Sequence, residues 1–363
     1  MTDPDVPGFG PVLVVGAGLM GTSVGLALRR HGVEVYLRDR SPMVARVAAS
    51  LGAGSDHAPH AAPRLVVVAV PPDHLGAAVA AALREWPRAY VTDIGSVKVK
   101  PLTDAAGLGA ELRRYVGGHP MAGSERSGPI AGSADLFDGR AWAVTPHPEA
   151  AADGVAAVHW LVRRCGAVLV SMSPAEHDQA VARISHLPHV LAVLAAARLP
   201  DAPAQHLALS GAGLRDVTRV AGGDPALWRQ ILTANAPALT DLLRQVRTDL
   251  EALIDSLATP EHDVAGADLE ALLHRGSSGA ATIPAKHGGP VRADAPIFVL
   301  VPDQPGELAR LFADTGAVGV NIEDIRIDHD PARPAGLVEL TVAADSAGHL
   351  VQALDARGWT IHR

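Results

Sequence analysis

A glycine-rich turn joins an apolar segment to a helix near the N-terminus, and it constrains the fold more than any other feature. Residues 11–15 are a short β-branched run, the turn Gly16-Ala-Gly-Leu-Met-Gly21 follows at once, and a helical stretch covers residues 22–31. Gly16 permits a tight turn, Gly18 lets a pyrophosphate approach the backbone, and Gly21 lets the helix pack against the strand. Free amide groups at the start of such a helix bind phosphates. The segment therefore predicts the first βαβ unit of a dinucleotide-binding domain.

An acidic residue stands where such a domain binds the adenosine ribose. Asp39 follows the second predicted strand, residues 33–38, and lies 18 residues after Gly21. Its carboxylate would accept hydrogen bonds from the ribose hydroxyls, which favours NAD. Arg38 and Arg40 flank it and would suit a 2′-phosphate, so NADP stays open. The expected cofactor contacts are Gly16, Gly18, Leu19, Met20, Gly21, Asp39, Val70 and Pro71.

Further strands alternate with helices along the N-terminal half. Apolar runs predict four of them, at residues 65–70, 89–92, 141–145 and 167–170. Strands that alternate with helices pair in parallel, so the fold class is α/β, with a Rossmann-like doubly wound sheet over residues 1–172. Ligands of such sheets lie beyond the carboxyl ends of the strands. Asp93 and His119 each follow a predicted strand and are expected at that edge.

Two polar segments carry the candidate chemistry, Asp93-Ile-Gly-Ser-Val-Lys98 and Gly117-Gly-His-Pro-Met-Ala-Gly-Ser-Glu125. Pro120 restricts the backbone of His119 to extended conformations. A neutral imidazole there can take a hydroxyl proton while hydride leaves the same carbon. Ser96 would bond that hydroxyl or orient the ring. The other interpretations are a helix start capped by Asp93 or Ser96 and a packed glycine loop around His119.

Composition and charge exclude other classes of protein. The chain has 363 residues, enough for two or three domains, and its formal net charge of −8 argues against a nucleic-acid or anionic-membrane binder. The single cysteine, Cys165, fits a reducing, cytoplasmic setting. The sequence has no evident secretory signal, membrane-spanning run or metal-ligand cluster, so a cytoplasmic protein without a metal is expected.

The second half of the chain predicts further units. Residues 173–258 are typical of an all-helical domain, and apolar residues within 239–254 recur at three- and four-residue spacing, so these faces must be buried. Residues 259–295 are predicted to be a linker because of their glycine-rich stretches, although 268–274 favour a short helix. Residues 296–363 predict the order βαββαβ, the ferredoxin-like arrangement.

Five motifs, in this order, resemble the prephenate dehydrogenase family, which includes arogenate and cyclohexadienyl dehydrogenases. They are the turn at residues 16–23, the segments 93–98 and 119–125, Ser185-His-Leu-Pro-His189, and Gly213-Leu-Arg-Asp-Val-Thr-Arg219 with Asp224-Pro-Ala-Leu-Trp228. The resemblance runs from residue 11 to about residue 255. It implies an NAD-dependent oxidative decarboxylation of a small ring substrate, prephenate or arogenate. It also implies that the helical domain forms a homodimer and completes the active site.

The resemblance implies a role for each matching residue. His119 would accept the proton of the ring C4 hydroxyl, Ser96 would bond that hydroxyl and the histidine, and Arg219 would bind a substrate carboxylate through its guanidinium fork. The other implied substrate-binding residues are His189, His186, Ser124, Asp216 and Trp228. By their chemistry alone, Trp228 would equally suit the core, Asp216 a helix ion pair and His186 a packed histidine.

The C-terminal unit resembles a second family. Residues 301–307 and 319–324 are similar to the ACT domain, a small amino-acid-binding regulatory module, and the logic of the pathway makes tyrosine its effector. A structural or dimer-forming module without a ligand stays open. Three hypotheses follow: a prephenate dehydrogenase regulated by tyrosine, an arogenate dehydrogenase, and a nucleotide-binding regulatory protein without turnover.

Overall fold

The computed structural model describes residues 9–123, 126–258, 263–283, 294–329 and 335–362. The chain divides into two compact units, residues 1–248 and residues 249–363. The first unit contains the glycine turn and His119, so it holds the candidate site. None of the described helices is long and apolar enough to cross a membrane.

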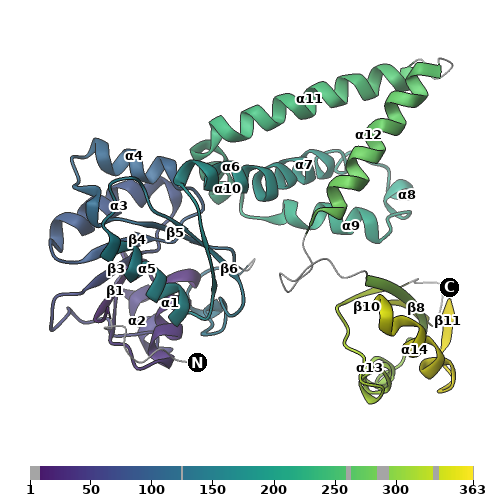
Figure 1. The fold of residues 1–363 in the computed structure, drawn as a ribbon, viewed down its shortest axis with the longest axis horizontal. Coiled ribbons are helices and arrows are strands. Elements are labelled where there is room, and N and C mark those ends of the chain that lie inside the picture. Colours follow the sequence, from purple (N-terminus) through teal and green to yellow (C-terminus); the bar gives the residue numbers. More distant parts are fainter. Residues whose placement is uncertain (1–8, 124–125, 259–262, 284–293, 330–334, 363) are drawn as a thin grey trace. The chain divides into compact units, whose positions relative to one another are not determined.

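A four-stranded parallel sheet lies at the centre of the N-terminal part, in the order β2-β1-β3-β4 (Figure 1). Its strands are β1 (Val12–Val15), β2 (Val35–Arg38), β3 (Leu65–Val68) and β4 (Tyr90–Asp93). Val12 and Val14 face one core cluster, whereas Leu13 faces the other. Because both faces are covered, these strands are apolar at almost every position. The predicted parallel, α/β arrangement is confirmed for these four strands.

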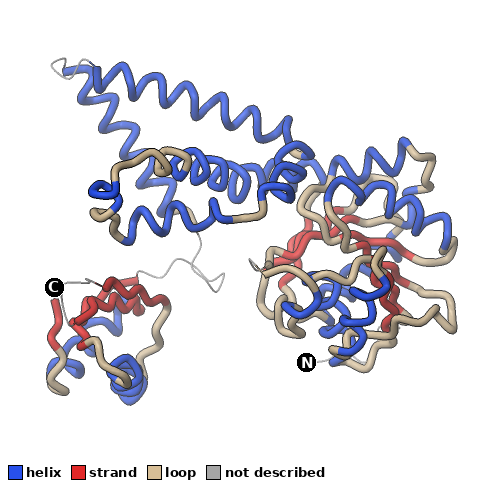
Figure 2. The backbone as a smooth tube through the Cα atoms, turned by 180° about the vertical axis from the view of Figure 1, so that it is seen from behind, coloured by secondary structure: helices blue, strands red, loops and turns tan. Residues whose placement is uncertain are grey.

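Helices cover both faces of this sheet, as Figure 2 shows from behind. One core cluster joins the sheet to α1 (Leu19–Arg30), α2 (Pro42–Ser50) and α5 (Ala152–Arg164). The other joins it to α3 (Pro72–Glu85) and α4 (Val99–Gly107). The carboxyl ends of the strands, and with them the starts of α1, α3 and α4, lie at one edge of the sheet.

The remaining strands of this part form a separate mixed sheet, which corrects the prediction of one doubly wound sheet. Its order is β5-β6-β7, with β5 (Gly117–Pro120), β6 (Ala141–Thr145) and β7 (Val168–Ser171). β5 runs antiparallel to β6, and among the described residues an isolated bridge between Val91 and Tyr115 links β4 to the segment that leads into β5. His119 was expected beyond a strand but lies within β5. This strand was not predicted because it carries glycines and a proline in place of β-branched residues.

The helices that follow match the predicted helical domain. They are α6 (Pro174–Val181), one turn of π-helix η3 (Ala182–His186), α7 (Leu187–Ala196), α8 (Ala204–Leu207), α9 (Ala212–Arg219), α10 (Pro225–Ala234) and α11 (Ala236–Ala258). α6 starts with a capping box, in which Ser173 Oγ accepts from the amide of Glu176 and Glu176 accepts from the amide of Ser173. Short 3₁₀ turns are η1 (Leu112–Arg114), η2 (Pro129–Ala131) and η4 (Val220–Gly222).

The predicted linker is a helix over much of its length. α12 (Asp263–Ala281) occupies residues that were expected to connect two domains. Glycines at 276 and 279 suggested a flexible stretch, but the alanines and leucines around them are strong helix formers. An ion pair of 2.7 Å between Arg275 and Asp249 joins this helix to the end of α11. Only the shorter helix suggested at 268–274 anticipated this element.

The C-terminal sheet has the ferredoxin-like topology that was predicted. Its elements are β8 (Asp294–Pro302), α13 (Glu307–Ala317), β9 (Asp324–His329), β10 (Ala335–Ala343), α14 (Ala344–Asp355) and β11 (Thr360–His362). The strand order is β11-β8-β10-β9, and all neighbours are antiparallel. Alternate residues of β8 and β10 point toward the two helices and form a core with Leu311 and Leu350.

Candidate active site

The glycine turn has the geometry that the sequence predicts. Gly16 adopts φ +100°, and a Cβ there would lie 2.3 Å from the carbonyl oxygen of Ala69. A Cβ on Gly21 would lie 1.8 Å from the carbonyl oxygen of Gly16, so the close helix–strand packing needs glycine. A Cβ on Gly18 would meet nothing within 4 Å, and no side chain caps the start of α1. The open amides of this helix end, with space in front of them, fit a pyrophosphate.

Asp39 lies at the carboxyl end of β2, beside the turn. Its two carboxylate oxygens accept from the amides of Ala17 and Ser41, each at 2.9 Å. Each oxygen keeps a lone pair for a further donor such as a ribose hydroxyl. Arg38 is held by Glu85 in a two-bond ion pair of 2.7 and 2.8 Å. The residues predicted to contact the cofactor after β3, Val70 and Pro71, follow that strand at the same edge of the sheet.

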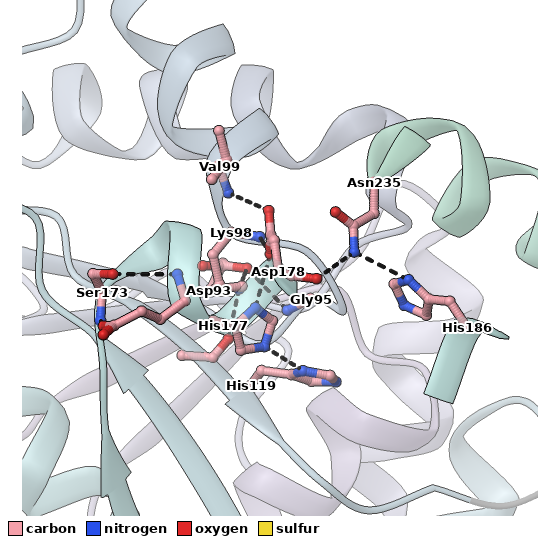
Figure 3. Close-up of polar contacts among 12 residues, drawn as sticks. Asp93, Gly95, Lys98, Val99, His119, Ser173, His177, Asp178, His186 and Asn235 are labelled. Atoms are coloured by element: carbon pink, nitrogen blue, oxygen red, sulfur yellow. Dashed lines mark hydrogen bonds and ion pairs between the residues drawn. The ribbon is translucent and has the colours of Figure 1, made fainter. Parts of the chain in front are cut away.

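His119 is partly exposed in β5, and a second histidine lies directly behind it (Figure 3). Its Nδ1 atom lies 2.9 Å from Nε2 of His177, and Nδ1 of His177 lies 2.8 Å from Oδ1 of Asp178. The capped helix α6 supplies both partners. This pair was not predicted from the sequence, because only the packing of α6 brings its residues to His119.

A buried ion pair fixes the turn after β4 to β5. Asp93 accepts from the ammonium of Lys98, from the hydroxyl of Tyr115 at 2.8 Å and from the amide of Gly95 at 2.9 Å. Lys98 also donates to the carbonyl oxygen of Gly118 at 2.6 Å. Lys98 and Asp93 are 1% and 0% exposed. The Lys98–Asp93 ion pair thus ties the turn at residues 93–98 to the backbone next to His119. Asp93 does not cap a helix.

The surroundings of His119 keep its ring neutral. Burial lowers the pKa of His119 well below its ordinary value, and the positive charge on His177, Lys98 or His186 would lower it further. A histidine whose pKa lies well below neutrality is unprotonated at pH 7, so its free ring nitrogen can accept a proton. The site therefore offers a ready general base on β5, next to the residue that Lys98 ties to the carboxyl end of β4.

Two histidines and a tryptophan gather on the helical side of the site. The ring of His189 stacks on Trp228 with centroids 3.4 Å apart and planes within 7°. A Cβ on Gly223 would lie 2.4 Å from the indole nitrogen, so a glycine lets the ring sit there. Among the described residues, Nδ1 of His189 is buried without a hydrogen-bond partner. A buried polar atom of this kind fits a ligand group that completes its hydrogen bonding.

His186 is a packed histidine in this structure. It is 2% exposed, its Nδ1 accepts from the side-chain amide of Asn235 at 3.1 Å, and burial lowers its pKa to about 4. Asn235 also donates to the carbonyl oxygen of Asp178 at 2.7 Å. Asn235 therefore links Asp178, on the His119 side of the site, to His186 on η3.

The other predicted site residues are less tightly placed. Ser96 is half-buried in the turn after β4, and its hydroxyl makes no hydrogen bond with another described residue, His119 included. Asp216 and Arg219 lie on α9 and are exposed. Ser124 lies outside the described residues. Within the described part of the chain, no group of three or more His, Cys, Asp and Glu side chains is arranged to hold a metal ion.

The glycine turn, the acidic residue after β2 and a neutral histidine at the sheet edge are together the features of a dinucleotide-dependent dehydrogenase. Comparison with known proteins identifies the family. The family model "Prephenate dehydrogenase, nucleotide-binding domain" matches residues 24–171, and "Prephenate dehydrogenase, dimerization domain" matches residues 173–274. The chain belongs to the prephenate dehydrogenase family, as its motifs predict. The second model extends through most of α12, which supports assigning that helix to the helical domain.

Individual relatives agree with this assignment. The probable prephenate dehydrogenase NovF of Streptomyces niveus is 36% identical, over 96% of this chain and 98% of its own. The solved structure of prephenate dehydrogenase from Aquifex aeolicus, with hydroxyphenyl propionate and NAD+, is 28% identical, with a TM-score of 0.64 over 74% of this chain and 97% of its own. The structure of Synechocystis arogenate dehydrogenase is 27% identical, with a TM-score of 0.62 over 74% and 98%.

Proposed function

We propose that this protein is an NAD-dependent prephenate dehydrogenase that converts prephenate to 4-hydroxyphenylpyruvate in tyrosine biosynthesis. The observation that carries the proposal is a neutral, partly exposed His119 in a chain of this family, whose glycine turn after β1 fits a pyrophosphate. When bound, NAD+ supplies a hydride acceptor. His119 accepts the proton of the ring hydroxyl as hydride leaves the same carbon. The bond from the ring to its carboxylate then breaks, CO2 departs and the ring becomes aromatic.

We propose that the helical side of the site binds the ring carboxylate and the side chain. Arg219 offers a planar fork to a carboxylate, and His189 offers the buried Nδ1 atom that has no partner among the described residues. Trp228 holds the His189 ring by stacking. Asp216, Ser124 and the hydroxyl of Ser96 stay predicted contacts, with Ser96 free to bond a substrate hydroxyl. His186 supports this group from behind.

NAD is the cofactor that these residues favour. Asp39 would accept from both ribose hydroxyls and would repel a 2′-phosphate. Of the two flanking arginines that would suit such a phosphate, Arg38 is already paired with Glu85. Arg40 alone is a weaker site for a dianion. The Aquifex relative was solved with NAD+.

Arogenate is the second candidate substrate, because the Synechocystis relative is an arogenate dehydrogenase. Arogenate differs from prephenate in carrying an amine where the side chain has a keto group, away from the reacting hydroxyl. His119 and the ring-carboxylate residues therefore serve either substrate. A regulatory protein without turnover is disfavoured, because the histidine, its partners and the cofactor turn are all intact.

Steady-state rates with both substrates and both cofactors test the proposal. We expect NADH formation with prephenate, release of one CO2 per NADH, and a kcat/KM at least about tenfold higher than with arogenate or with NADP+. The measurement is absorbance at the reduced nicotinamide band, with CO2 trapped in parallel. Absence of turnover with both substrates would reject the function, and a preference for arogenate would select the second candidate.

We propose that the helical domain forms a homodimer. Several large apolar side chains of this region are exposed in the single chain, among them Ile184, Leu194 and Leu209. An apolar surface of this kind is usually covered by a partner. The match to a family dimerization domain supports the same assembly.

We propose further that residues 296–363 are an ACT domain that binds tyrosine. In support, the sheet has the ferredoxin-like order, and no side chain caps the start of α13 at Gly306, where the helix dipole favours a carboxylate. We expect L-tyrosine to inhibit the intact enzyme, and L-phenylalanine to inhibit it far less. A chain lacking residues 296–363 should keep its turnover and lose this inhibition. Equal inhibition of the two chains would place the effector elsewhere.

A further inference from the structure

A histidine and an aspartate lie buried behind His119, and the proposed function gives neither of them a role. His177 is 1% exposed and Asp178 is 5% exposed, on adjacent positions of α6. The contacts run in one line, from His119 to His177 and then to Asp178, at 2.9 and 2.8 Å (Figure 3). The two imidazole planes meet at 69°, with centroids 5.1 Å apart. Such a line of hydrogen bonds fixes where each proton can reside.

The proton positions follow from the far end of the line. Asp178 accepts from the amide of Lys98 at 2.8 Å and from the amide of Val99 at 2.9 Å, one on each oxygen. A carboxylate held by two amide donors is an acceptor, so Nδ1 of His177 must carry the proton that it shares with Oδ1. In neutral His177 the Nε2 atom is then a lone pair. Nδ1 of His119 must donate to it, which leaves Nε2 of His119 unprotonated.

We propose that His177, held by Asp178, is a positioning residue that fixes the tautomer of His119 with Nε2 free to accept the substrate proton. This inference rests on the proposed function, in which His119 is the base. In the reaction the hydroxyl O–H bond breaks and a new N–H bond forms at Nε2, so His119 becomes an imidazolium. Its bond to His177 becomes charge-assisted, and the carboxylate of Asp178 stabilises the added charge through His177.

The other charged groups near His119 strengthen the need for such support. The ammonium of Lys98 lies on the turn after β4 and is paired with Asp93, which also binds Tyr115. The positive charge of Lys98 disfavours an imidazolium at His119, whereas His186, which approaches from η3, is neutral at pH 7 because burial lowers its pKa to about 4. The carboxylate of Asp178 is connected to His119 through the ring of His177, by one hydrogen bond on each side of that ring. Without that line, both ring nitrogens of His119 would compete for one proton, and a fraction of the molecules would hold the wrong tautomer.

Two substitutions of His177 separate positioning from packing. His177→Gln places an amide oxygen where Nε2 lies and keeps an acceptor for His119, whereas His177→Leu keeps volume and removes the acceptor. We expect His177→Leu to lower kcat about 100-fold, with the KM for prephenate and the Kd for NAD+ within about threefold. His177→Gln should stay within about tenfold of the native kcat. Equal losses in both variants, or no loss in His177→Leu, would overturn the proposal.

A matched control and a direct measurement complete the test. His147 is another buried histidine of this unit, and its ring bonds the main chain of Leu112 and Glu149, so His147→Leu should leave kcat within about twofold. Nitrogen-15 NMR of histidine-labelled protein, assigned with a His119→Asn variant, reports the tautomer without substrate. We expect a protonated Nδ1 and a free Nε2 on His119, and a mixture of tautomers in His177→Leu. A free Nδ1 in the native protein would overturn the proposal even if the enzyme proved active, and an inactive enzyme with the expected tautomer would refute the function alone.

Discussion

Replacing His119 with asparagine is expected to lower kcat about 1000-fold while the affinity for NAD+ stays within about twofold. Asparagine fits the space and retains a polar side chain, but its amide does not accept a proton at neutral pH. The cofactor contacts lie on the turn after β1 and at Asp39, on other elements, so they are preserved. The loss should therefore fall on the chemical step.

The pH dependence sharpens this expectation. Because burial and nearby charges hold the pKa of His119 well below its ordinary value, the native base is already neutral at pH 7. Native kcat/KM should thus fall only as the pH drops well below the ordinary histidine pKa of about 6.5, and raising the pH should not restore the variant. Steady-state kinetics and calorimetric titration with NAD+ measure the two effects. An exposed histidine, His74, provides the control: His74→Asn should be indistinguishable from the native enzyme, and a His119→Asn rate within about fivefold of native would remove His119 from the mechanism.

Local motifs predicted the geometry of the glycine turn and the position of Asp39 beside it. Gly16, Gly21 and Asp39 act within one βαβ unit, where strand, turn and helix are neighbours in the chain. The steric demands of that unit fall on residues that are close together in the sequence, so the spacing of these residues was enough to predict them. His119 was found in the same way, because its proline and glycine neighbours mark a constrained backbone.

The partners of His119 were beyond this kind of reasoning. His177 is 58 residues further along the chain and reaches His119 only because α6 packs beside β5 and β6. The role of Lys98 was hidden for a similar reason: a lysine in a polar turn is usually solvated, yet this one is buried against Asp93 and Gly118. Tertiary packing decides both cases, and no local pattern reports it.

For two elements, β5 and α12, the local composition led to a wrong prediction. β5 contains two glycines and a proline, which are poor strand formers, and it is held in place by pairing with β6 and by the bond from Lys98. In α12 the glycines suggested flexibility, but a helix tolerates them at about 1 kcal/mol each when its neighbours favour helix. In both segments the surrounding structure outweighs the weak preference of single residues.

Breaking the buried Lys98–Asp93 ion pair should also destabilise the N-terminal part strongly. Lys98→Met is expected to lower the free energy of unfolding by about 3–5 kcal/mol, because it leaves the Asp93 carboxylate buried without its cation. Tyr115 and Gly95 still donate to Asp93, which limits the loss, but the carbonyl oxygen of Gly118 also loses its donor. Methionine matches the aliphatic length of lysine, so packing changes little. Urea denaturation followed by tryptophan fluorescence measures the change.

Lys100 supplies a matched control two residues away. It forms an ion pair of 2.7 Å with Asp104, one helical turn further on, but both side chains are about 40% exposed. Water already solvates these charges, so Lys100→Met should cost less than about 0.5 kcal/mol. Adding Asp93→Asn to Lys98→Met should recover part of the loss, because a neutral amide is cheaper to bury than an unpaired carboxylate. Equal costs for the two lysines would mean that the Lys98–Asp93 pair does not hold β5, and the position of His119 would then depend on the hydrogen bond to His177 and on the pairing with β6.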